Sequence, residues 1–375
     1  MREISHKLAF THDAPATRYS DVFDPNNGGV QARVALGDAA LLDLAVAAAK
    51  KAQPAWAAVN PQRRARVMFN FKALVEANMT ELAHLLSSEH GKVIADSKGD
   101  IQRGLEVIEF CCGIPHVLKG EYTQGAGPGI DVYSFRQPIG IGAGITPFNF
   151  PGMIPLWMSG VAIATGNAFI LKPSERDPSV PVRLAELFSE AGLPDGILQV
   201  VQGDKEMVDA ILDHPDIKGV SFVGSSDIAH YVYNRGVAAG KRVQAMGGAK
   251  NHGIVMPDAD LDQVVNDLSG AAFGSAGERC MALPVVVPVG EKTPLRSVKN
   301  SSPRSKPCAS ASPPMPKPIM ARSSPPRTSR RSKTGSRPAS TKAPSWWSTA
   351  AASRCKAMRK ASSSAPPCST MSPPA

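Results

Sequence analysis

Residues 138–172 read PIGIGAGITPFNFPGMIPLWMSGVAIATGNAFILK, and this stretch decides the fold. Two short apolar runs within it, at 139–145 and 168–172, have the length and composition of buried strands. The segment between them, 153–164, has the length and apolar content of a buried helix. A buried strand, a helix and a second buried strand in succession predict a parallel βαβ unit.

The same alternation continues as far as residue 256. It predicts an α/β protein in which a Rossmann-type parallel sheet is covered by helices on both faces. Such a sheet binds its ligand beyond the carboxyl ends of the strands, where the strand order reverses. Further strands are expected at 197–201, 219–223 and 252–256, with helices at 178–191, 205–213 and 227–238.

Other elements are predicted on both sides of this sheet. Apolar residues recur at helical spacing at 38–57, where Asp38 is a candidate N-cap, and again at 62–90 and 101–117. Residues 119–137 mix glycine with alternating β-forming residues, which indicates a hairpin or a crossing segment. A further helix is expected at 260–275, beyond the sheet.

Charge is distributed unevenly along the 375 residues, whose formal net charge is +10. From Lys292 onward there are 17 Lys and Arg residues and no Asp or Glu, which leaves the preceding residues with a net charge of −7. The stretch 292–375 is rich in Ser and Pro and has almost no apolar periodicity, so it is expected to be disordered.

Two interpretations of residues 292–375 stay open: a genuine basic tail, or the product of a shifted reading frame. We favour the shifted frame, because the change in composition is abrupt and follows directly on the apolar run 283–289. A GC-rich gene read out of frame would give such Ser-, Pro-, Arg- and Ala-rich sequence. Translation of the other two frames would distinguish the two interpretations.

The cysteines and the apolar content indicate a cytoplasmic protein. The six cysteines show no spacing typical of disulfides or of a metal site. No apolar stretch at the start has the length of a signal peptide, and no apolar run approaches the roughly 18 residues that span a bilayer. A reducing compartment, no membrane and no metal are therefore expected.

Three segments near strand ends carry candidate chemistry. Asn149, in TPFNFP (146–151), could donate to an oxyanion, or could satisfy its own backbone in a turn. Lys172 and Glu175, in LKPSE, could hold a nucleotide ribose, or could be solvated turn charges. Gly224 and Ser225, in FVGSS, begin a predicted helix, whose free N–H groups suit a pyrophosphate.

Cys280 follows a glycine-rich approach and an arginine in GSAGERCMALP (274–284). Reactive cysteines occur beside cationic side chains in such surroundings. The alternative is an inert buried cysteine, and this stretch taken alone favours that alternative.

Read together, these motifs resemble the aldehyde dehydrogenase superfamily from about Phe10 to about Val289. The order TPFNFP, LKPSE, FVGSS, AMGGAKNH (245–252) and GERCMA is that of the family. The stretches NFPGMIPLWM, MGGAKNHGIVMPDA and GSAGERCMAL are similar to its CoA-acylating branch, the methylmalonate-semialdehyde dehydrogenases.

The resemblance implies a role for each motif. Cys280 would attack the aldehyde and Asn149 would stabilise the resulting oxyanion, with NAD as hydride acceptor and coenzyme A as co-substrate. The resemblance also implies the cofactor-binding residues, which are Thr146, Pro147, Phe148, Lys172, Glu175, Gly224 and Ser225.

The branch within the family is indicated by position 245. Hydrolytic relatives carry a glutamate before this Gly-Gly, where it activates water, whereas this chain has Ala245. Transfer of the acyl group to CoA needs less help, because a thiol is already partly ionised and strongly nucleophilic. The resemblance therefore implies oxidation of methylmalonate or malonate semialdehyde to propanoyl-CoA or acetyl-CoA, as in valine or inositol breakdown.

The substrate carboxylate is expected to meet two arginines. By motif position these are Arg279, beside the nucleophile, and Arg103, in DIQRGLEVIEF. The planar guanidinium pairs with a carboxylate through two parallel hydrogen bonds. Arg103 could instead be a charge on a helix surface.

The resemblance further implies a domain organisation and a homo-oligomer, a dimer or a tetramer in the complete family member. The expected parts are an NAD domain (1–118 and 138–250), an oligomerisation arm (119–137), the start of an incomplete catalytic domain (251–291) and the tail (292–375). A later glutamate of the family has no counterpart in the tail. We therefore expect partial folding, exposed apolar surface around 260–290 and little activity.

The sequence leaves two alternative functions open. A hydrolytic aldehyde dehydrogenase is disfavoured by Ala245. Non-enzymatic nucleic-acid binding through the basic tail would use its 17 positive charges, but aromatic residues are scarce there apart from Trp346 and Trp347, and no recognition motif is present. No specific nucleic-acid partner is expected.

Overall fold

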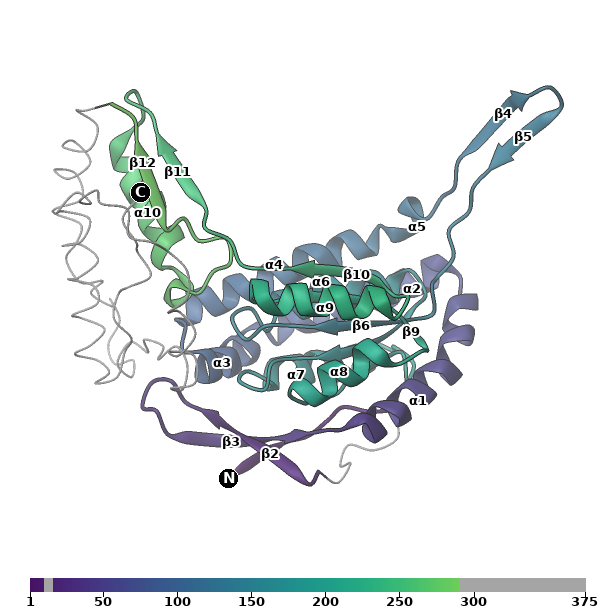
Figure 1. The fold of residues 1–375 in the computed structure, drawn as a ribbon, viewed down its shortest axis with the longest axis horizontal. Helices are drawn as coiled ribbons and strands as arrows, with labels where there is room; N and C mark the ends of the chain where they lie inside the picture. The colour runs from purple at the N-terminus through teal and green to yellow at the C-terminus, as the bar shows by residue number, and fades with distance from the viewer. Residues whose placement is uncertain (10–15, 291–375) are drawn as a thin grey trace. The chain divides into compact units, whose positions relative to one another are not determined.

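The alternating segments predicted around residues 138–256 fold into a five-stranded parallel sheet in the computed structural model, which describes residues 1–9 and 16–290. Its strand order is β10-β9-β6-β7-β8, and every neighbouring pair is parallel. The strands are β6 (Ile141–Ile145), β7 (Ala168–Lys172), β8 (Leu198–Val200), β9 (Ile217–Val223) and β10 (Arg242–Met246) (Figure 1).

The helices between these strands lie where the sequence predicts them. They are α6 (Met153–Ala164), α7 (Ser179–Glu190), α8 (Lys205–Asp213) and α9 (Ser226–Ala238). Both central strands β6 and β7 are buried along their whole length, as expected for a parallel sheet with covered faces. The α/β fold class with a Rossmann-type parallel sheet is therefore confirmed.

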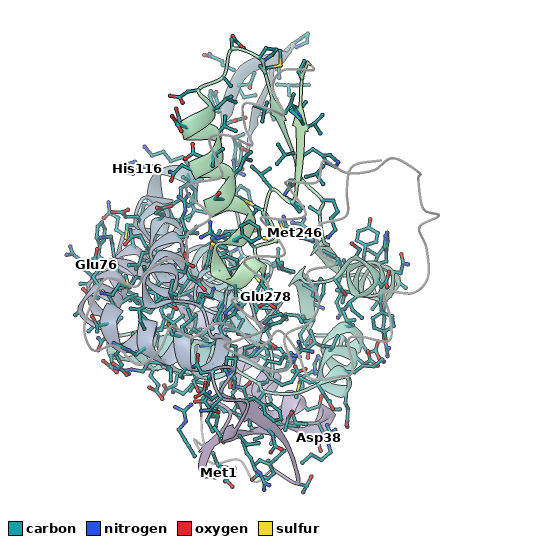
Figure 2. The ribbon with its side chains drawn as sticks, turned by 90° about the vertical axis from the view of Figure 1, so that its left-hand side faces the viewer. Met1, Asp38, Glu76, His116, Met246 and Glu278 are labelled. Carbon is teal, nitrogen blue, oxygen red and sulfur yellow. The ribbon has the colours of Figure 1, made fainter. Side chains whose placement is uncertain are left out.

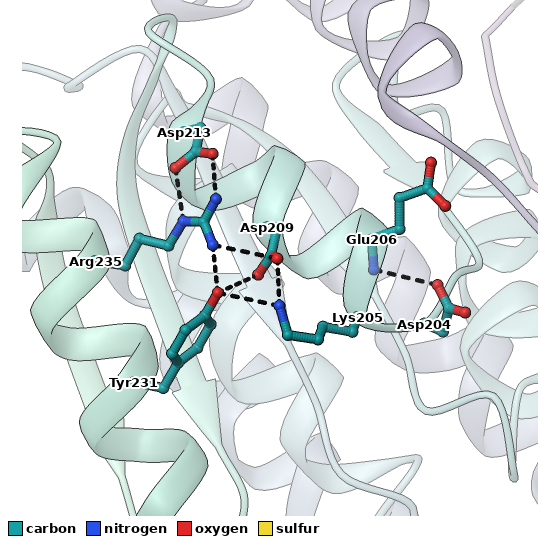
Figure 3. Close-up of polar contacts among 7 residues, drawn as sticks. All are labelled: Asp204, Lys205, Glu206, Asp209, Asp213, Tyr231 and Arg235. Carbon is teal, nitrogen blue, oxygen red and sulfur yellow. Dashed lines mark hydrogen bonds and ion pairs between the residues drawn. The ribbon is translucent and has the colours of Figure 1, made fainter.

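A surface network of charged and phenolic groups joins α8 to α9 (Figure 3). The Arg235 guanidinium binds both carboxylate oxygens of Asp213, and the Tyr231 hydroxyl donates to Asp209 at 2.6 Å. Because these groups are half-buried or exposed, each contact adds modest stability to the packing of the two helices.

A small sheet and a long helix precede the parallel sheet. β1 (Arg2–Ile4), β3 (Val30–Leu36) and β2 (Arg18–Phe23) lie side by side in that order and enclose a core of Ile4, Val22, Ala32 and Val34. The sequence did not predict this sheet. Helix α1 (Ala39–Ala58) is confirmed, and the Asp38 carboxylate caps it by accepting from the Leu41 N–H at 3.0 Å. Asp38 is labelled in Figure 2.

The helical region before residue 118 corrects two predictions. The single helix expected at 62–90 is two helices, α2 (Pro61–Ala77) and α3 (Met79–His90). They are separated at Asn78, whose side chain and backbone N–H both bind the Leu74 carbonyl. The helix expected at 101–117 begins earlier, as α4 (Ile94–Cys112), and is followed by the short α5 (Ile114–Val117).

Residues 119–137 contain the predicted hairpin, β4 (Tyr122–Gly127) paired with β5 (Ile130–Tyr133) in antiparallel fashion. Its residues are almost entirely exposed. The exposed apolar side chains of this hairpin and its flank are Tyr122, Ile130, Val132, Tyr133 and Phe135.

The segment 252–256 does not belong to the large sheet, which corrects the prediction made for it. Strand β11 (His252–Val255) pairs instead with β12 (Val285–Pro288) in a separate parallel pair. Helix α10 (Leu261–Phe273) lies between these strands in the chain and is capped by Asp260. Met281 in this region is 75% exposed. The exposed apolar surface expected around 260–290 stays a prediction.

The chain forms two compact units. The first contains residues 1–23, 30–90 and 97–247, and the second contains 24–29, 91–96 and the described residues from Gly248 onward. The predictions for residues 292–375 lie outside the described residues. Within the described ranges, no helix is long and apolar enough to cross a membrane, and no cluster of side chains could hold a metal ion.

Candidate active site

The strand order places three of the predicted motifs at one edge of the parallel sheet. From β6 the chain proceeds to β7 and β8 on one side, then crosses to β9 and β10 on the other. The order therefore reverses between β6 and β9, and the crevice beyond their carboxyl ends is the usual ligand position. Thr146, Lys172 and Gly224 stand at or just beyond the ends of β6, β7 and β9.

The loop after β6 is fixed from several sides. The Thr146 N–H donates to the Lys172 carbonyl at 3.1 Å, which extends the pairing of β6 with β7. Two contacts hold the Phe148 ring: its centroid lies 6.0 Å from that of the His90 ring and 5.1 Å from the Arg176 guanidinium. Asn149, the next residue, is half-buried. The predicted oxyanion donor therefore follows a clamped aromatic residue.

The start of α6, directly after this loop, is held by a residue that the sequence did not single out. The Asp100 carboxylate, 1% exposed, accepts from the Met153 N–H at 2.7 Å. Gly152, the residue before the helix, offers no side chain to cap it. Asp100 thus supplies the missing cap from α4, and favourable interaction with the helix dipole is expected.

Lys172 and Glu175 form the ion pair expected of neighbouring charged groups. The buried Lys172 ammonium lies 3.2 Å from a Glu175 oxygen. Burial alone would raise the pKa of the Glu175 carboxyl, but the Lys172 ammonium, hydrogen bonds and the Arg176 guanidinium outweigh it and hold that pKa below its ordinary value. Glu175 is therefore an ionised acceptor at neutral pH, as a ligand of ribose hydroxyls must be.

Several features of this edge fit a dinucleotide such as NAD. The Thr146 hydroxyl oxygen is buried and has no hydrogen-bond partner among the described residues. A Cβ on Gly224 would lie 2.4 Å from the Phe222 ring, so the backbone turns there without room for a side chain. Ser225 precedes α9 as its N-cap without making a side-chain capping bond. The α9 terminus suits an anionic group.

Cys280 lies in the second unit, after a strained turn. Ser275, Ala276 and Gly277 have φ angles of 53°, 57° and 79°, all in the left-handed region. Such a conformation costs about 1–3 kcal/mol at each non-glycine residue and is concentrated at functional sites. Cys280 is a free, half-buried thiol. The strain in this turn supports the interpretation of Cys280 as a functional cysteine over that of an inert core cysteine.

Two polar side chains that the sequence did not single out hold this turn. The Asp96 carboxylate accepts from the Ser275 N–H at 2.8 Å and pairs with the Arg279 guanidinium at 3.2 Å. The Asn251 amide donates to the Ala282 carbonyl at 2.9 Å, two residues after Cys280. Asn251 belongs to the motif AMGGAKNH (245–252), whereas no sequence pattern indicated Asp96.

The two predicted substrate arginines have different surroundings. Arg279 is anchored by Asp96 next to Cys280, and a Cβ on Gly274 would lie 2.6 Å from its guanidinium. The Arg103 side chain, on α4 in the first unit, is 67% exposed and pairs with Glu106 at 2.7 Å. Its surroundings are those of a surface charge, the alternative that the sequence left open.

The parallel sheet with a reversed strand order defines a Rossmann-type α/β protein, and the chain adds to it a free cysteine in a strained turn. A model of the aldehyde dehydrogenase family matches residues 10–292. The chain belongs to this family.

Similar proteins support the same branch of the family. A malonate-semialdehyde dehydrogenase of Pseudomonas aeruginosa is 55% identical over 275 residues, which are 73% of this chain and 55% of that protein. The mitochondrial, acylating methylmalonate-semialdehyde dehydrogenase of Arabidopsis thaliana is 50% identical over 279 residues, 74% of this chain and 46% of that protein. The chain thus spans about half the length of the curated relatives it matches.

Solved structures agree with this comparison. A Sinorhizobium meliloti 1021 protein complexed with NAD, described as a candidate methylmalonate-semialdehyde dehydrogenase, is 63% identical with a TM-score of 0.80. The match covers 82% of this chain and 63% of that one. The enzyme of the same name from Oceanimonas doudoroffii is 51% identical with a TM-score of 0.80, covering 81% and 62%.

Proposed function

We propose that the chain carries out NAD-dependent, CoA-acylating oxidation of malonate or methylmalonate semialdehyde. The observation that carries the proposal is Ala245 on β10, a residue without a carboxylate, in a chain 50–55% identical to semialdehyde dehydrogenases. With no glutamate at this position, water lacks its expected activating base. The site therefore favours release of the acyl group to a thiol.

The chemistry follows from the residues. The Cys280 thiolate adds to the aldehyde carbon, and the Asn149 amide stabilises the oxyanion that forms. When bound, NAD would supply the hydride acceptor, and loss of the hydride from the adduct would leave a thioester on Cys280. The thiol of coenzyme A would then take the acyl group, with the Cys280 thiolate as the leaving group. Loss of the substrate carboxylate as carbon dioxide, with uptake of one proton at the carbon that carried it, would give acetyl-CoA or propanoyl-CoA.

The cofactor is assigned to the first unit. Lys172 and Glu175 would hold the adenosine ribose, while Gly224 and Ser225 would receive the pyrophosphate. Thr146, Pro147 and Phe148 would border the nicotinamide end. The orphaned Thr146 hydroxyl and the ionised Glu175 support this assignment.

A stoichiometric reaction tests the proposal even if turnover is slow. The full chain is mixed with NAD and malonate semialdehyde, and NADH is followed by its absorbance. Without CoA, we expect formation of NADH to stop at about one per chain, because the thioester persists. CoA should restart it. Equally fast continued reaction without CoA would contradict the acylating assignment, and no NADH at all would contradict the dehydrogenase function.

Substrate selection should depend on Arg279. Replacing Arg279 with glutamine should raise KM for malonate semialdehyde by about 10- to 100-fold, the effect of a lost charged hydrogen bond. Propanal, which has no carboxylate, should be a poor substrate and be little affected. The exposed Arg242 offers a control, Arg242→Gln. An equal rise in KM for malonate semialdehyde and for propanal would count against carboxylate binding by Arg279. A role of Arg103 in binding the substrate carboxylate stays a proposal.

The domain roles, the assembly and the location complete the proposal. Residues 1–118 and 138–250 would form the NAD domain, and 251–291 would begin the catalytic domain. The exposed apolar side chains of the β4–β5 hairpin support its role as an oligomerisation arm in a dimer or tetramer. The free thiols of Cys111, Cys112 and Cys280 support a reducing compartment such as the cytoplasm.

The expectation of little activity stays a prediction. It rests on residues 292–375, which lie outside the described residues. The stoichiometric experiment also measures this property, because it separates the ability to form one NADH from the ability to turn over.

A further inference from the structure

Helix α7 begins directly after the loop that carries Glu175, and it has no cap of its own. Pro178 precedes the helix and makes no side-chain capping bond. The first N–H groups of a helix need partners from outside it when they are buried. Ser179, the first residue of α7, is buried. A partner for its N–H must therefore come from another element.

The partner is Glu89, in the last turn of α3. One Glu89 oxygen accepts from the Ser179 N–H at 3.0 Å, and the other accepts from the Ser179 hydroxyl. The Arg2 guanidinium binds the latter oxygen at 2.8 Å. The Glu89 side chain is fully buried, whereas that of Arg2 is 49% exposed. The Glu89 carboxylate thus caps α7 from a position 90 residues away in the sequence.

The loop 173–178 is held at both of its ends. Lys172, the residue before it, is the last residue of β7 and pairs with Ile145 of β6. Ser179, the residue after it, is bound by Glu89 through its N–H and its hydroxyl. Glu89 thus fixes the end of the loop that the sheet does not hold.

We propose that Glu89 is a positioning residue for the cofactor: by capping α7 at Ser179, it fixes the end of the loop from which Glu175 would face the ribose. This inference rests on the proposed cofactor site. Glu89 would not touch the cofactor itself and would act through the position of Glu175. A second contact between the same two helices provides a contrast, because the Glu81–Arg183 pair is exposed and lies away from the loop.

The test measures NAD binding to the full chain by calorimetry. Glu89→Ala should weaken NAD binding about tenfold, as expected from loss of a cap and of hydrogen bonds to a charged group. Glu89→Gln keeps an acceptor for the Ser179 N–H and should stay within about threefold of the unsubstituted chain. Glu81→Gln is the matched control and should leave NAD binding unchanged.

A double substitution separates positioning from general destabilisation. In a Glu175→Gln background, adding Glu89→Ala should weaken binding by less than about twofold, because the group being positioned is already lost. A purely structural role would give the full tenfold effect again. If Glu89→Ala does not fold, Glu89→Asp replaces it, since its shorter side chain cannot reach the same N–H.

Hydrogen exchange of the NAD-free chain supplies an independent readout. Glu89→Ala should speed hydrogen exchange in the peptide covering 173–182. Glu81→Gln should leave the exchange rate of that peptide unchanged. If the unsubstituted chain fails to bind NAD, the proposed function is wrong, and faster exchange would still support the positioning contact. Normal NAD affinity and normal exchange in folded Glu89 variants would overturn the inference.

Discussion

Replacing Cys280 with alanine is expected to abolish NADH formation from malonate semialdehyde, even in the stoichiometric reaction without CoA. No other group in the proposed mechanism can form the thiohemiacetal from which hydride leaves. Loss of an enzyme nucleophile typically lowers the rate by on the order of 10⁴-fold or more. The measurement is NADH absorbance, together with mass spectrometry of the peptide that contains residue 280.

The controls for this variant use other properties of the chain. NAD affinity should not change, because the cofactor residues lie in the first unit and Cys280 in the second. Cys112→Ala should react normally, since burial raises the pKa of the Cys112 thiol and keeps it protonated at neutral pH. Burial raises the pKa of Cys111 to about 12, with the same consequence. An acyl group on any cysteine other than Cys280 would refute the assignment.

Local apolar patterns were sufficient to predict most of the parallel sheet. Strand β7 and helices α6 and α8 begin and end at the predicted residues, because each is a buried or strongly amphipathic run bounded by turn residues. Strand β10 was missed because it lies at the sheet edge, where Arg242 and Gln244 are exposed and interrupt the apolar run. Strand β10 can be recognised only when its pairing with β9 is known.

Other errors and omissions arise from long-range pairing. Nothing local shows that 252–255 pairs with 285–288 rather than joining the large sheet. The bond from Arg279 to Asp96 spans 183 residues, and that from Ser179 to Glu89 spans 90. Composition and periodicity report burial, but they do not report which buried charge finds which partner. The motifs therefore indicated the candidate reacting groups but not the residues that hold them in place.

Replacing Asn149 with alanine should slow stoichiometric NADH formation by about 10²–10³-fold, the usual cost of losing one oxyanion donor. The expected cause is electrostatic, because the amide acts on charge that develops only as the thiolate adds to the carbonyl. NAD affinity should change little, and Asn70→Ala, at an exposed position on α2, should behave as the unsubstituted chain.

Alkylation by iodoacetamide distinguishes this role from a general disturbance of the site. Displacement of iodide by the Cys280 thiolate develops no oxyanion on a carbonyl, so Asn149→Ala should leave its rate nearly unchanged while NADH formation falls. The clamped Phe148 and the Asp100 cap at Met153 hold the backbone on both sides of residue 149, which makes a local collapse in the variant unfavourable. Equal losses in both reactions would mean that Asn149 maintains the site rather than stabilising the oxyanion.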